Sequence, residues 1–449
     1  MSDQAREKIV IRKVSRRLVP YLGLAFLFCI IDRNNLSFAA LTMNKELGFT
    51  ATLFGWGAGI FFVGYFFFEV PSNLALQKFG ARIWIGRIMI TWGLISAATC
   101  LVSGTKSFLV VRFMLGVAEA GFFPGIVFYL SHWFPERHRG MVLARFIFAQ
   151  PVALVVSSLI SGVVLKMNGF LGIAGWKWLF ILEGIPTVLL GIVTFFYLTD
   201  QPAKASWLEP GEREWLQAQM DEERARVEAA AHKLSLWQAL GHPRVLVLGL
   251  VYAGTVMCQS GTMMFLPQMV KALGAFSSSQ IGLIVSIPYI LASIGMLFMG
   301  HSSDRKQERK YHLLVSMLLI AAGMFGAVLF HANIVLTIAF MTLVAVGYFC
   351  TLPLFWILPS AFLTGTASAG GIALINSIGN LFNFFAQGSM GWLKDLTGDY
   401  RAGLGLLGVG VVIAAIVAYM IWLQIEKKRR LSAQEASPAE AQTARGAAK

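Results

Sequence analysis

Long apolar stretches recur along this chain, and polar residues gather in short segments between them. A helix needs about 20 apolar residues to cross the hydrocarbon core of a bilayer, and twelve stretches reach that length. Their apolar runs are continuous rather than alternating, which excludes a transmembrane β-barrel. The predicted spans are 18–40, 54–76, 82–103, 106–130, 141–164, 175–199, 244–271, 279–301, 311–330, 333–355, 367–391 and 401–426.

A polar segment divides these spans into two equal groups. Residues 200–243 contain 13 charged side chains in 44 positions, and they separate a first half of 182 residues (18–199) from a second half of 183 (244–426). Equal halves of six spans indicate a duplication, in which a substrate site forms at the midplane between two bundles. We therefore expect an all-α polytopic membrane protein of two pseudo-symmetric six-helix bundles. The N-terminus (1–17), the central loop and a disordered tail (427–449) would lie outside the membrane.

Composition supports the membrane class. Hydrophobic residues make up 57% of the 449 positions and charged residues 13%, whereas soluble domains are about 45–50% apolar and about 25% charged. The 4 cysteines lie within apolar runs, where a thiol acts as a small hydrophobic side chain, and no metal-ligand spacing is present. The polar first 17 residues, with no small-residue cleavage site after the first apolar run, argue against a cleaved signal peptide.

The Lys and Arg residues that give the net charge of +14 are distributed as in a membrane protein and do not form a nucleic-acid-binding patch. If both termini are cytoplasmic, that side carries 26 of the 37 Lys and Arg residues, the outer side carries 7, and the other 4 lie in or beside spans. Basic residues concentrate in cytoplasmic loops. We therefore expect both termini in the cytoplasm, the lipid bilayer as surroundings and no nucleic-acid partner.

Four ionisable residues lie within the first and fourth spans, where each charge costs about 2.5–3.5 kcal/mol on insertion scales. They are Asp32 and Arg33 in the first span, and Arg112 and Glu119 in the fourth. The two spans run in opposite directions. At 1.5 Å per residue, the two arginines lie about 10 Å and about 9 Å from the outer ends of their spans. Two guanidinium groups at one depth can hold a carboxylate.

Two interpretations of these four charges remain open. In the first, Asp32 pairs with Arg112 and Glu119 pairs with Arg33 as structural ion pairs, although four buried charges are a costly way to join two helices. In the second, the residues form a substrate site with proton carriers. Protonation of a buried carboxylate would then release a neighbouring arginine for an anionic substrate.

Uncharged polar residues extend the candidate site into the second half. Asn376, Asn380, Asn383 and Gln387 are spaced 4, 3 and 4 residues apart, so they share one helical face, and four amides would not face lipid. This amide stripe either joins helices or lines a cavity that binds hydroxyl and carboxylate groups. Tyr65 and Gln150 are either donors to the substrate or packing residues. Glu69 is expected to hold a cytoplasmic gate closed, and Glu183 is expected to be structural. A further gate is predicted at the broken inner end of the tenth span, marked by Pro353, Trp356 and Pro359.

The loop between the eighth and ninth spans carries a family motif. It reads Gly300-His301-Ser302-Ser303-Asp304-Arg305-Lys306, with Arg309 and Lys310 following. It resembles the signature loop of the major facilitator superfamily, G-x-x-x-D-R/K-x-G-R-R/K. The equivalent first-half loop, 73–82, has Gln77 in the place of the Asp and ends in Arg82. The gating and signature-loop positions are therefore Gln77, Arg82, Asp304 and Arg305.

The departure at Gln77 and six further segments resemble the anion:cation symporter family within that superfamily. The segments are Ile31–Asn35, Glu69–Asn73, Gly116–Gly125, Trp133–Pro135, Leu266–Gln268 and Leu374–Asn380. The resemblance extends over residues 15–425. It implies proton-coupled uptake of a small organic anion across the bacterial inner membrane, with the proton gradient as the energy source and no cofactor.

The resemblance also implies roles for individual residues, through the positions that match galactonate-type members. The proton-coupling positions are Asp32 and Glu119. The substrate-binding positions are Arg33, Arg112, Tyr65, Gln150, Asn376 or Asn380 and, from its place on the amide stripe, Asn383.

The substrate is best matched to a tartrate-like hydroxy acid, because residues 41–45 and 54–76 look most like the tartrate transporter branch. Relatives that carry 4-hydroxyphenylacetate, phthalate or sugar acids keep aromatic acids and sugar acids as alternatives, and exchange remains an alternative to symport. At 382–387 the chain reads Phe-Asn-Phe-Phe-Ala-Gln where relatives have G-G-F-x-G-P. This departure changes the side chains beside the amide stripe.

Two other functional classes compete with a transporter. The 7 His residues lie mostly near span ends, and HExxH and GxSxG motifs are absent from the sequence, which argues against a membrane enzyme. A transporter-like sensor would need an output domain, which a 44-residue loop and a short tail do not supply. We expect a monomeric transporter that is not an enzyme and binds no metal.

Overall fold

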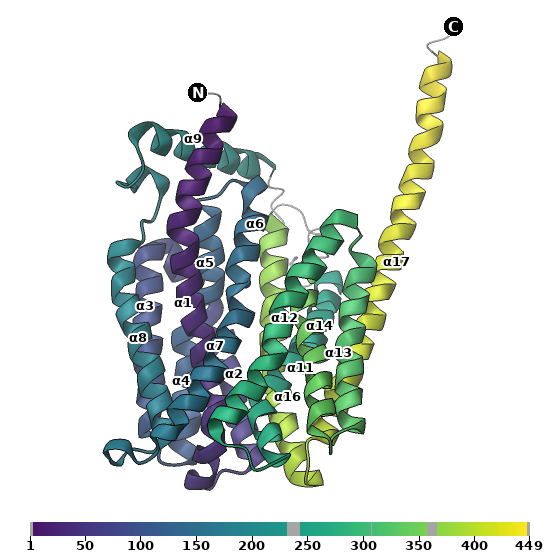
Figure 1. Cartoon of the computed structure of the whole chain (residues 1–449). Coiled ribbons are helices and arrows are strands. Elements are labelled where there is room, and N and C mark those ends of the chain that lie inside the picture. The colour runs from purple at the N-terminus through teal and green to yellow at the C-terminus, as the bar shows by residue number, and fades with distance from the viewer. Residues whose placement is uncertain (1–2, 231–242, 307, 357–365, 447–449) are drawn as a thin grey trace.

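The computed structural model describes residues 3–230, 243–306, 308–356 and 366–446, and every regular element in these ranges is a helix. The two halves of the chain form two groups of helices that stand side by side (Figure 1). The first group contains α1 (Asp3–Leu47), α2 (Ala51–Phe79), α3 (Ala81–Ala98), α4 (Thr105–Glu119), α5 (Phe122–Ser131), α6 (Glu136–Ile147), α7 (Ala149–Val164) and α8 (Gly175–Tyr197). The second contains α11 (Pro243–Ala272), α12 (Ser278–Lys306), α13 (Lys310–Leu329), α14 (Ile334–Phe355), α16 (Thr366–Thr397) and α17 (Arg401–Gly446).

The spans predicted over 106–130 and 141–164 lie within candidate spans of the structure, and each of these two passes is built from two helices. α4 and α5 form the fourth pass, and α6 and α7 form the fifth, meeting at Phe148. The fourth pass breaks at Gly121, whose φ of +86° lies in the left-handed region that glycine adopts without steric cost. The break directly follows Glu119 and its neighbour Ala120.

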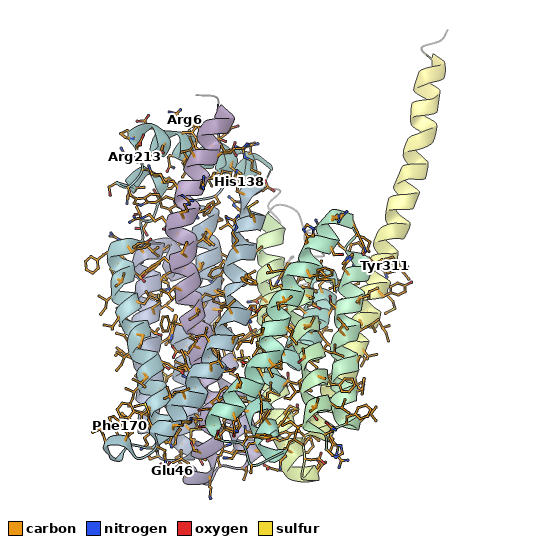
Figure 2. All side chains as sticks on the ribbon, viewed as in Figure 1. Arg6, Glu46, His138, Phe170, Arg213 and Tyr311 are labelled. Carbon is orange, nitrogen blue, oxygen red and sulfur yellow. The ribbon has the colours of Figure 1, made fainter. Side chains whose placement is uncertain are left out.

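Eleven stretches of the described chain are long and apolar enough to cross a membrane. The twelfth pass is α16, which is 32 residues long but has a lower hydropathy because it carries the amide stripe. Large apolar side chains point outward, among them Phe196 (84% exposed) and Phe298 (75% exposed). Figure 2 shows side chains projecting from the outer faces along the whole height of the molecule. A surface of this kind suits lipid rather than water.

Both ends of the chain lie at one end of the molecule, here called the termini face, and the opposite end is the far face (Figure 1). A helix of the central loop, α9 (Pro210–Ala230), lies across the termini face of the first group. Ion pairs hold it there, from Lys13 to Glu212 at 2.7 Å and from Arg139 to Glu223 at 2.7 Å. The tail continues α17 as a helix as far as Gly446, whereas the sequence predicts disorder over 427–449. A helix that has already formed extends without a new nucleus.

α2 and α16 pack against each other across the boundary between the two groups, and glycines allow their backbones to approach closely. A Cβ atom added at Gly55 would collide with the backbone carbonyl of Gln387, and one at Gly59 would lie 2.8 Å from the carbonyl of Phe384. Near the far face, Asp395 of α16 accepts hydrogen bonds from the backbone amides of Ala51 and Thr52, at 3.2 and 2.7 Å, and so caps α2.

A second boundary contact lies between α7 and α12, also toward the far face. A Cβ atom added at Gly162 would lie 2.7 Å from the carbonyl of Ser278, and the hydroxyl of Ser279 donates to the carbonyl of Gly162 at 3.1 Å. Small residues at helix interfaces permit this backbone contact. These two helix pairs close the space between the groups on the side of the far face.

Substitution of Gly55 by valine tests the closure at α2 and α16. The valine would collide with the Gln387 backbone, so we expect the helices to separate near the far face. Ser260, whose hydroxyl accepts a hydrogen bond from Gln387 at 2.9 Å, would then become reachable from that side. A membrane-impermeant maleimide should label Ser260→Cys several-fold faster in Gly55→Val, in a background without the native cysteines. Gly405→Val is the control, because an added Cβ there has no neighbour within 4 Å. Equal labelling rates in the two variants would contradict this interpretation.

Candidate functional site

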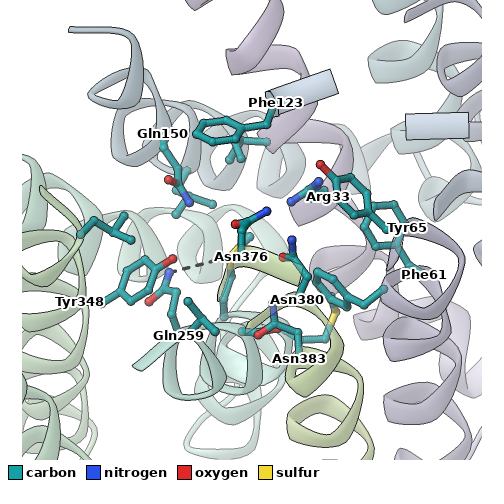
Figure 3. A pocket seen from close by; sticks show the side chains of 18 of the residues that line it. Arg33, Phe61, Tyr65, Phe123, Gln150, Gln259, Tyr348, Asn376, Asn380 and Asn383 are labelled. Atoms are coloured by element: carbon teal, nitrogen blue, oxygen red, sulfur yellow. Dashed lines mark hydrogen bonds between the residues drawn. The ribbon is translucent and has the colours of Figure 1, made fainter. Parts of the chain in front are cut away.

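A cavity of about 170 Å³ lies between the two groups of helices. By this measure one water needs roughly 10–15 Å³, so the cavity has room for on the order of ten non-hydrogen atoms. Figure 3 shows the polar side chains that face it from both halves. From the first half these are Arg33, Tyr65, Arg112 and Gln150, and from the second half Tyr252, Gln259, Ser260, Tyr348, Asn376, Asn380, Asn383 and Gln387.

Arg33 forms an ion pair with Glu119 in the wall of the cavity. Its Nε and Nη2 atoms both lie 2.6 Å from Oε1 of Glu119, and the thiol of Cys29 donates to the same oxygen at 3.2 Å. The other oxygen, Oε2, has no hydrogen-bond partner among the described residues. The Glu119 side chain is 1% exposed and that of Arg33 is 26% exposed. Arg33 is therefore the member of the pair that a bound molecule can reach.

Arg112 is a buried cation whose charge is not matched by an ion pair in the described part of the chain. It is 3% exposed, its Nη2 donates to the carbonyl of Ala58 at 3.3 Å, and its Nε has no partner there. The guanidinium groups of Arg33 and Arg112 lie 5.1 and 5.2 Å from the ring centre of Phe61. The ring face attracts both cations, so one aromatic side chain holds the two guanidinium groups at similar depth.

Asp32 does not approach either arginine, so the Asp32–Arg112 ion pair considered from the sequence is not formed. Its carboxylate instead accepts hydrogen bonds from Trp92 Nε1 at 2.7 Å, Ser96 Oγ at 3.0 Å and Thr187 Oγ1 at 3.1 Å. The reason is helical geometry. Consecutive residues are about 100° apart around an α-helix, so when Arg33 faces the cavity, Asp32 points toward α3 and α8.

The amide stripe faces the interior, and all four of its members line the cavity. Asn383 and Gln387 are 7% and 3% exposed, and Oδ1 of Asn383 and Oε1 of Gln387 lack hydrogen-bond partners among the described residues. Asn380 also makes no side-chain hydrogen bond within the described chain. The amide stripe therefore lines the cavity with amide groups that lack hydrogen-bond partners, and its role is more than joining helices.

Glu69 joins the two halves on the termini side of the cavity. Its Oε1 accepts from Asn376 Nδ2 at 3.0 Å and its Oε2 accepts from Ser377 Oγ at 2.9 Å. Asn376 thus belongs both to the cavity wall and to a contact between α2 and α16. Trp356, which follows the end of α14, also lines the cavity. Pro353 lies inside α14, while Pro359 lies outside the described residues.

Several residues of the cavity wall have no clear signal in the sequence. Tyr252, Gln259 and Ser260 on α11, and Tyr348 on α14, are single polar residues in apolar helices. A single residue carries no spacing pattern, so nothing in the sequence distinguishes its inward position from packing. The expected residues Tyr65 and Gln150 do line the cavity. Tyr65 is 2% exposed, and its ring lies 5.4 Å from the guanidinium carbon of Arg33.

The signature-loop residues lie away from the cavity, at the termini face. Gln77, Arg82 and Arg305 are exposed, and the side chain of Asp304 lies outside the described residues. In the first half, Gly80 has a φ of +88°, and Asp200 accepts from the backbone amide of Arg82 at 2.9 Å. The loop is thereby tied to the end of α8. No group of three or more His, Cys, Asp or Glu residues within the described ranges is placed to bind a metal ion.

Comparison with known proteins identifies the family that the chain matches. The chain matches the family described as Major Facilitator Superfamily over residues 22–387 and 248–448. It is 48% identical to a "Putative tartrate transporter" of Agrobacterium vitis, over 92% of this chain and 95% of that protein. It is 41% identical to the "Quinolone resistance transporter" of Acinetobacter baumannii, over 94% and 97%. The partially occluded inward-open structure of the xylose transporter XylE from E. coli has a TM-score of 0.71 at 18% identity, covering 91% of this chain and 97% of that one. That likeness concerns the fold.

The unequal burial of Arg33 and Glu119 predicts unequal effects on stability. Arg33→Ala would leave the Glu119 charge buried without a partner, at a cost of roughly 3–5 kcal/mol. Glu119→Gln would leave Arg33 at the edge of a cavity that water can enter, so its cost should be smaller. We expect Arg33→Ala to lower the unfolding temperature of the purified protein more than Glu119→Gln does. The double variant should recover part of the loss. Equal losses in the two single variants would argue against the pair as described.

Proposed function

The chain belongs to the Major Facilitator Superfamily, and we propose that it takes up a small organic carboxylate together with protons. Membership of the family makes it a multi-pass membrane transporter and not an enzyme. We further propose that it lies in the inner membrane of a bacterium with both termini in the cytoplasm, because 26 of its 37 Lys and Arg residues lie on that side and 7 on the other. In this orientation the termini face is cytoplasmic.

The buried, unpaired guanidinium of Arg112 is the observation that supports an anionic substrate most directly. A buried cation is unfavourable unless an anion balances it, and Arg112 lines the cavity with no ion pair in the described part of the chain. Arg33 lies beside the same Phe61 ring. Planar guanidinium groups bind carboxylates through paired hydrogen bonds. A carboxylate between the two arginines would complete the charge balance of the site.

The amide stripe and the size of the cavity favour a small hydroxy acid. Amide groups that lack partners can donate to, and accept from, hydroxyl groups, and Asn380, Asn383 and Gln387 supply such groups. An acid of about ten non-hydrogen atoms fits a cavity of about 170 Å³. A tartrate-like acid satisfies both conditions. The 48% identical relative named for tartrate supports the same choice.

Glu119 is the proposed link between protons and substrate. While ionised it holds Arg33 through the 2.6 Å contacts, and a substrate must compete with it for the guanidinium group. Protonation of Glu119 removes that competition, so a proton and an anion would bind together. Glu69 is the proposed gate residue, because its contacts with Asn376 and Ser377 close the cytoplasmic side of α2 against α16. A substrate that engages Asn376 would weaken that contact.

An aromatic acid is the second candidate substrate, supported by the aromatic side chains in the cavity wall. Phe61, Phe123 and Tyr348 are among the residues that line it, and aromatic rings pack favourably against one another. A 4-hydroxyphenylacetate-like molecule would use the same arginines for its carboxylate. Relative affinities for tartrate and 4-hydroxyphenylacetate, measured by thermal shift of the purified protein, separate the two candidates. A sugar acid would share the hydroxyl contacts of tartrate.

Asn380→Ala tests whether the amide stripe recognises hydroxyl groups. Loss of an amide that pairs with a substrate hydroxyl leaves that hydroxyl unpaired, at roughly 1–3 kcal/mol, which is about fivefold or more in affinity. We expect the variant to weaken binding of tartrate by at least that factor and to leave binding of succinate, which lacks the hydroxyls, nearly unchanged. Calorimetric titration of both acids provides the measurement. A parallel loss for both acids would indicate that Asn380 acts in packing.

Glu119→Gln tests the coupling to protons. Glutamine resembles the protonated acid but releases no proton, so the carrier should still bind substrate and exchange it across the membrane. Net uptake into proteoliposomes driven by a pH gradient should be lost. Wild-type rates of gradient-driven accumulation in the variant would place the proton route elsewhere. Failure of the wild type to exchange labelled substrate, despite binding it, would favour the sensor.

A further inference from the structure

A second group of buried polar residues lies behind α1, on the side away from the cavity. It is formed by Asp32 and Asn35 of α1, Ser161 of α7, and Glu183 and Thr187 of α8, which are all between 0% and 4% exposed. None of the five lines the cavity. The substrate site described above uses neither Glu183 nor Asn35. A carboxyl group buried in an apolar span is unfavourable without a function or a compensating partner.

Glu183 is poorly supplied with hydrogen bonds for an ionised carboxylate. Its Oε1 accepts one hydrogen bond, from Ser161 Oγ at 3.1 Å, and its Oε2 has no partner among the described residues. Asn35 is fully buried beside it, and its amide lies close enough to interact with the Glu183 carboxyl group. An amide oxygen accepts a hydrogen bond from a carboxylic acid but not from a carboxylate. An amide nitrogen donates equally well to a carboxylate, so Asn35 can partner either form of Glu183 and does not decide between them.

Asp32 has the opposite surroundings. Three donors, the indole of Trp92 and the hydroxyls of Ser96 and Thr187, point at its two oxygens within 3.1 Å. Several donors on one carboxyl group stabilise its ionised form. Asp32 is also near enough to Glu183 for their charges to repel. Two carboxyl groups that share a buried region cannot both ionise without a counter-charge.

The described elements around Glu183 provide no such counter-charge. On α1, Arg33 is directed to Glu119 on the cavity side. On α3, the guanidinium of Arg87 lies over the ring of Trp84 at 4.0 Å. α7 contains no ionisable residue from Ala149 to Val164. At the far face, Glu46 of α1 is engaged with the indole of Trp176 at 2.8 Å. The repulsion between the two carboxyl groups is thus removed only if one of the two acids is neutral.

We propose that Asp32 and Glu183 form a second proton-binding site, separate from the Arg33–Glu119 pair, and that Glu183 holds the proton. The proton covers the otherwise unpartnered Oε2 and removes one of two like charges from the apolar interior. α1 then carries an arginine–carboxylate pair on its cavity side and a proton-sharing carboxyl pair on the opposite side. This inference concerns proton binding alone, and it does not depend on which molecule the cavity accepts.

Infrared spectroscopy of the purified full-length protein tests this site. A protonated carboxyl group gives a C=O stretching band that ionised carboxylates lack, and the band shifts in D2O. At neutral pH and without substrate, the wild type should show such a band and Glu183→Gln should lose it. Glu119→Gln should keep it, because Glu119 lies on the cavity side of α1 in contact with Arg33 and outside the proposed site. The absence of substrate separates this result from any failure of the proposed transport function.

A second pair of variants keeps the test decisive if Glu183→Gln does not fold. Ser161→Ala removes the hydroxyl that donates to Glu183, so the band should move to higher frequency without disappearing. Ser158→Ala is the matched control, because that buried hydroxyl donates to the backbone carbonyl of Leu154 at 2.7 Å, and the band should not move. A band insensitive to both Glu183→Gln and Ser161→Ala, or one removed only by Asp32→Asn, would overturn the assignment to Glu183. Loss of the band when sodium chloride replaces choline chloride would show a sodium site in place of a proton site.

Discussion

Glu119 is completely buried, and its ionised form is balanced by one group, the guanidinium of Arg33 at 2.6 Å. Arg33 also lines the cavity, beside Arg112. One cation therefore serves two possible anions, the internal carboxylate and a molecule in the cavity. Both anions need the donors of the Arg33 guanidinium, so a molecule in the cavity would compete with ionised Glu119 for them, and protonation of Glu119 would remove that competition. Coupling in this protein is proposed to depend on that competition.

The two halves contribute different chemistry to the cavity. The first half supplies both cations, Arg33 and Arg112, beside Tyr65 and Gln150, while the second supplies only uncharged polar groups, from α11, α14 and α16. Amides neither gain nor lose protons in the working range, so they can recognise a substrate without disturbing the proton balance of Glu119. Glu69 is the exception to this division, since its carboxylate crosses from α2 to Asn376 and Ser377 on α16. It connects the recognition surface of the second half to a contact that must break when the halves separate.

The sequence predicts those features of the site that depend on spacing within one helix. The 4-3-4 spacing of the amide stripe places its four members on the cavity side, and the continuous apolar runs correctly predict an all-helical membrane protein. The same reasoning can predict the direction of Asp32. Adjacent residues on a helix point about 100° apart, and an anion in the cavity attracts Arg33 rather than Asp32, so Asp32 must point elsewhere. Contacts between helices are different. The meeting of Gly55 with Gln387, or of Glu69 with Asn376, joins positions about 300 residues apart, and one sequence carries no information on that register.

The glycine contacts that close the cavity near the far face differ in physical nature from the Glu69 hydrogen bonds near the termini face. The two sides of the cavity therefore open in different ways. Glycine contacts such as Gly59 against Phe384 depend on dispersion over closely matched backbones, and a gap of about 0.5–1 Å already removes about a quarter to a half of that attraction. The Glu69 contacts depend on hydrogen bonds that water can replace once it enters. Opening toward the far face must therefore break a whole interface at once, whereas opening toward the termini face exchanges a few hydrogen bonds for hydration. On these contacts the termini face is the easier one to open from this conformation. In the orientation proposed above this is the cytoplasmic side, which suits the proposed release of a substrate and a proton into the cell.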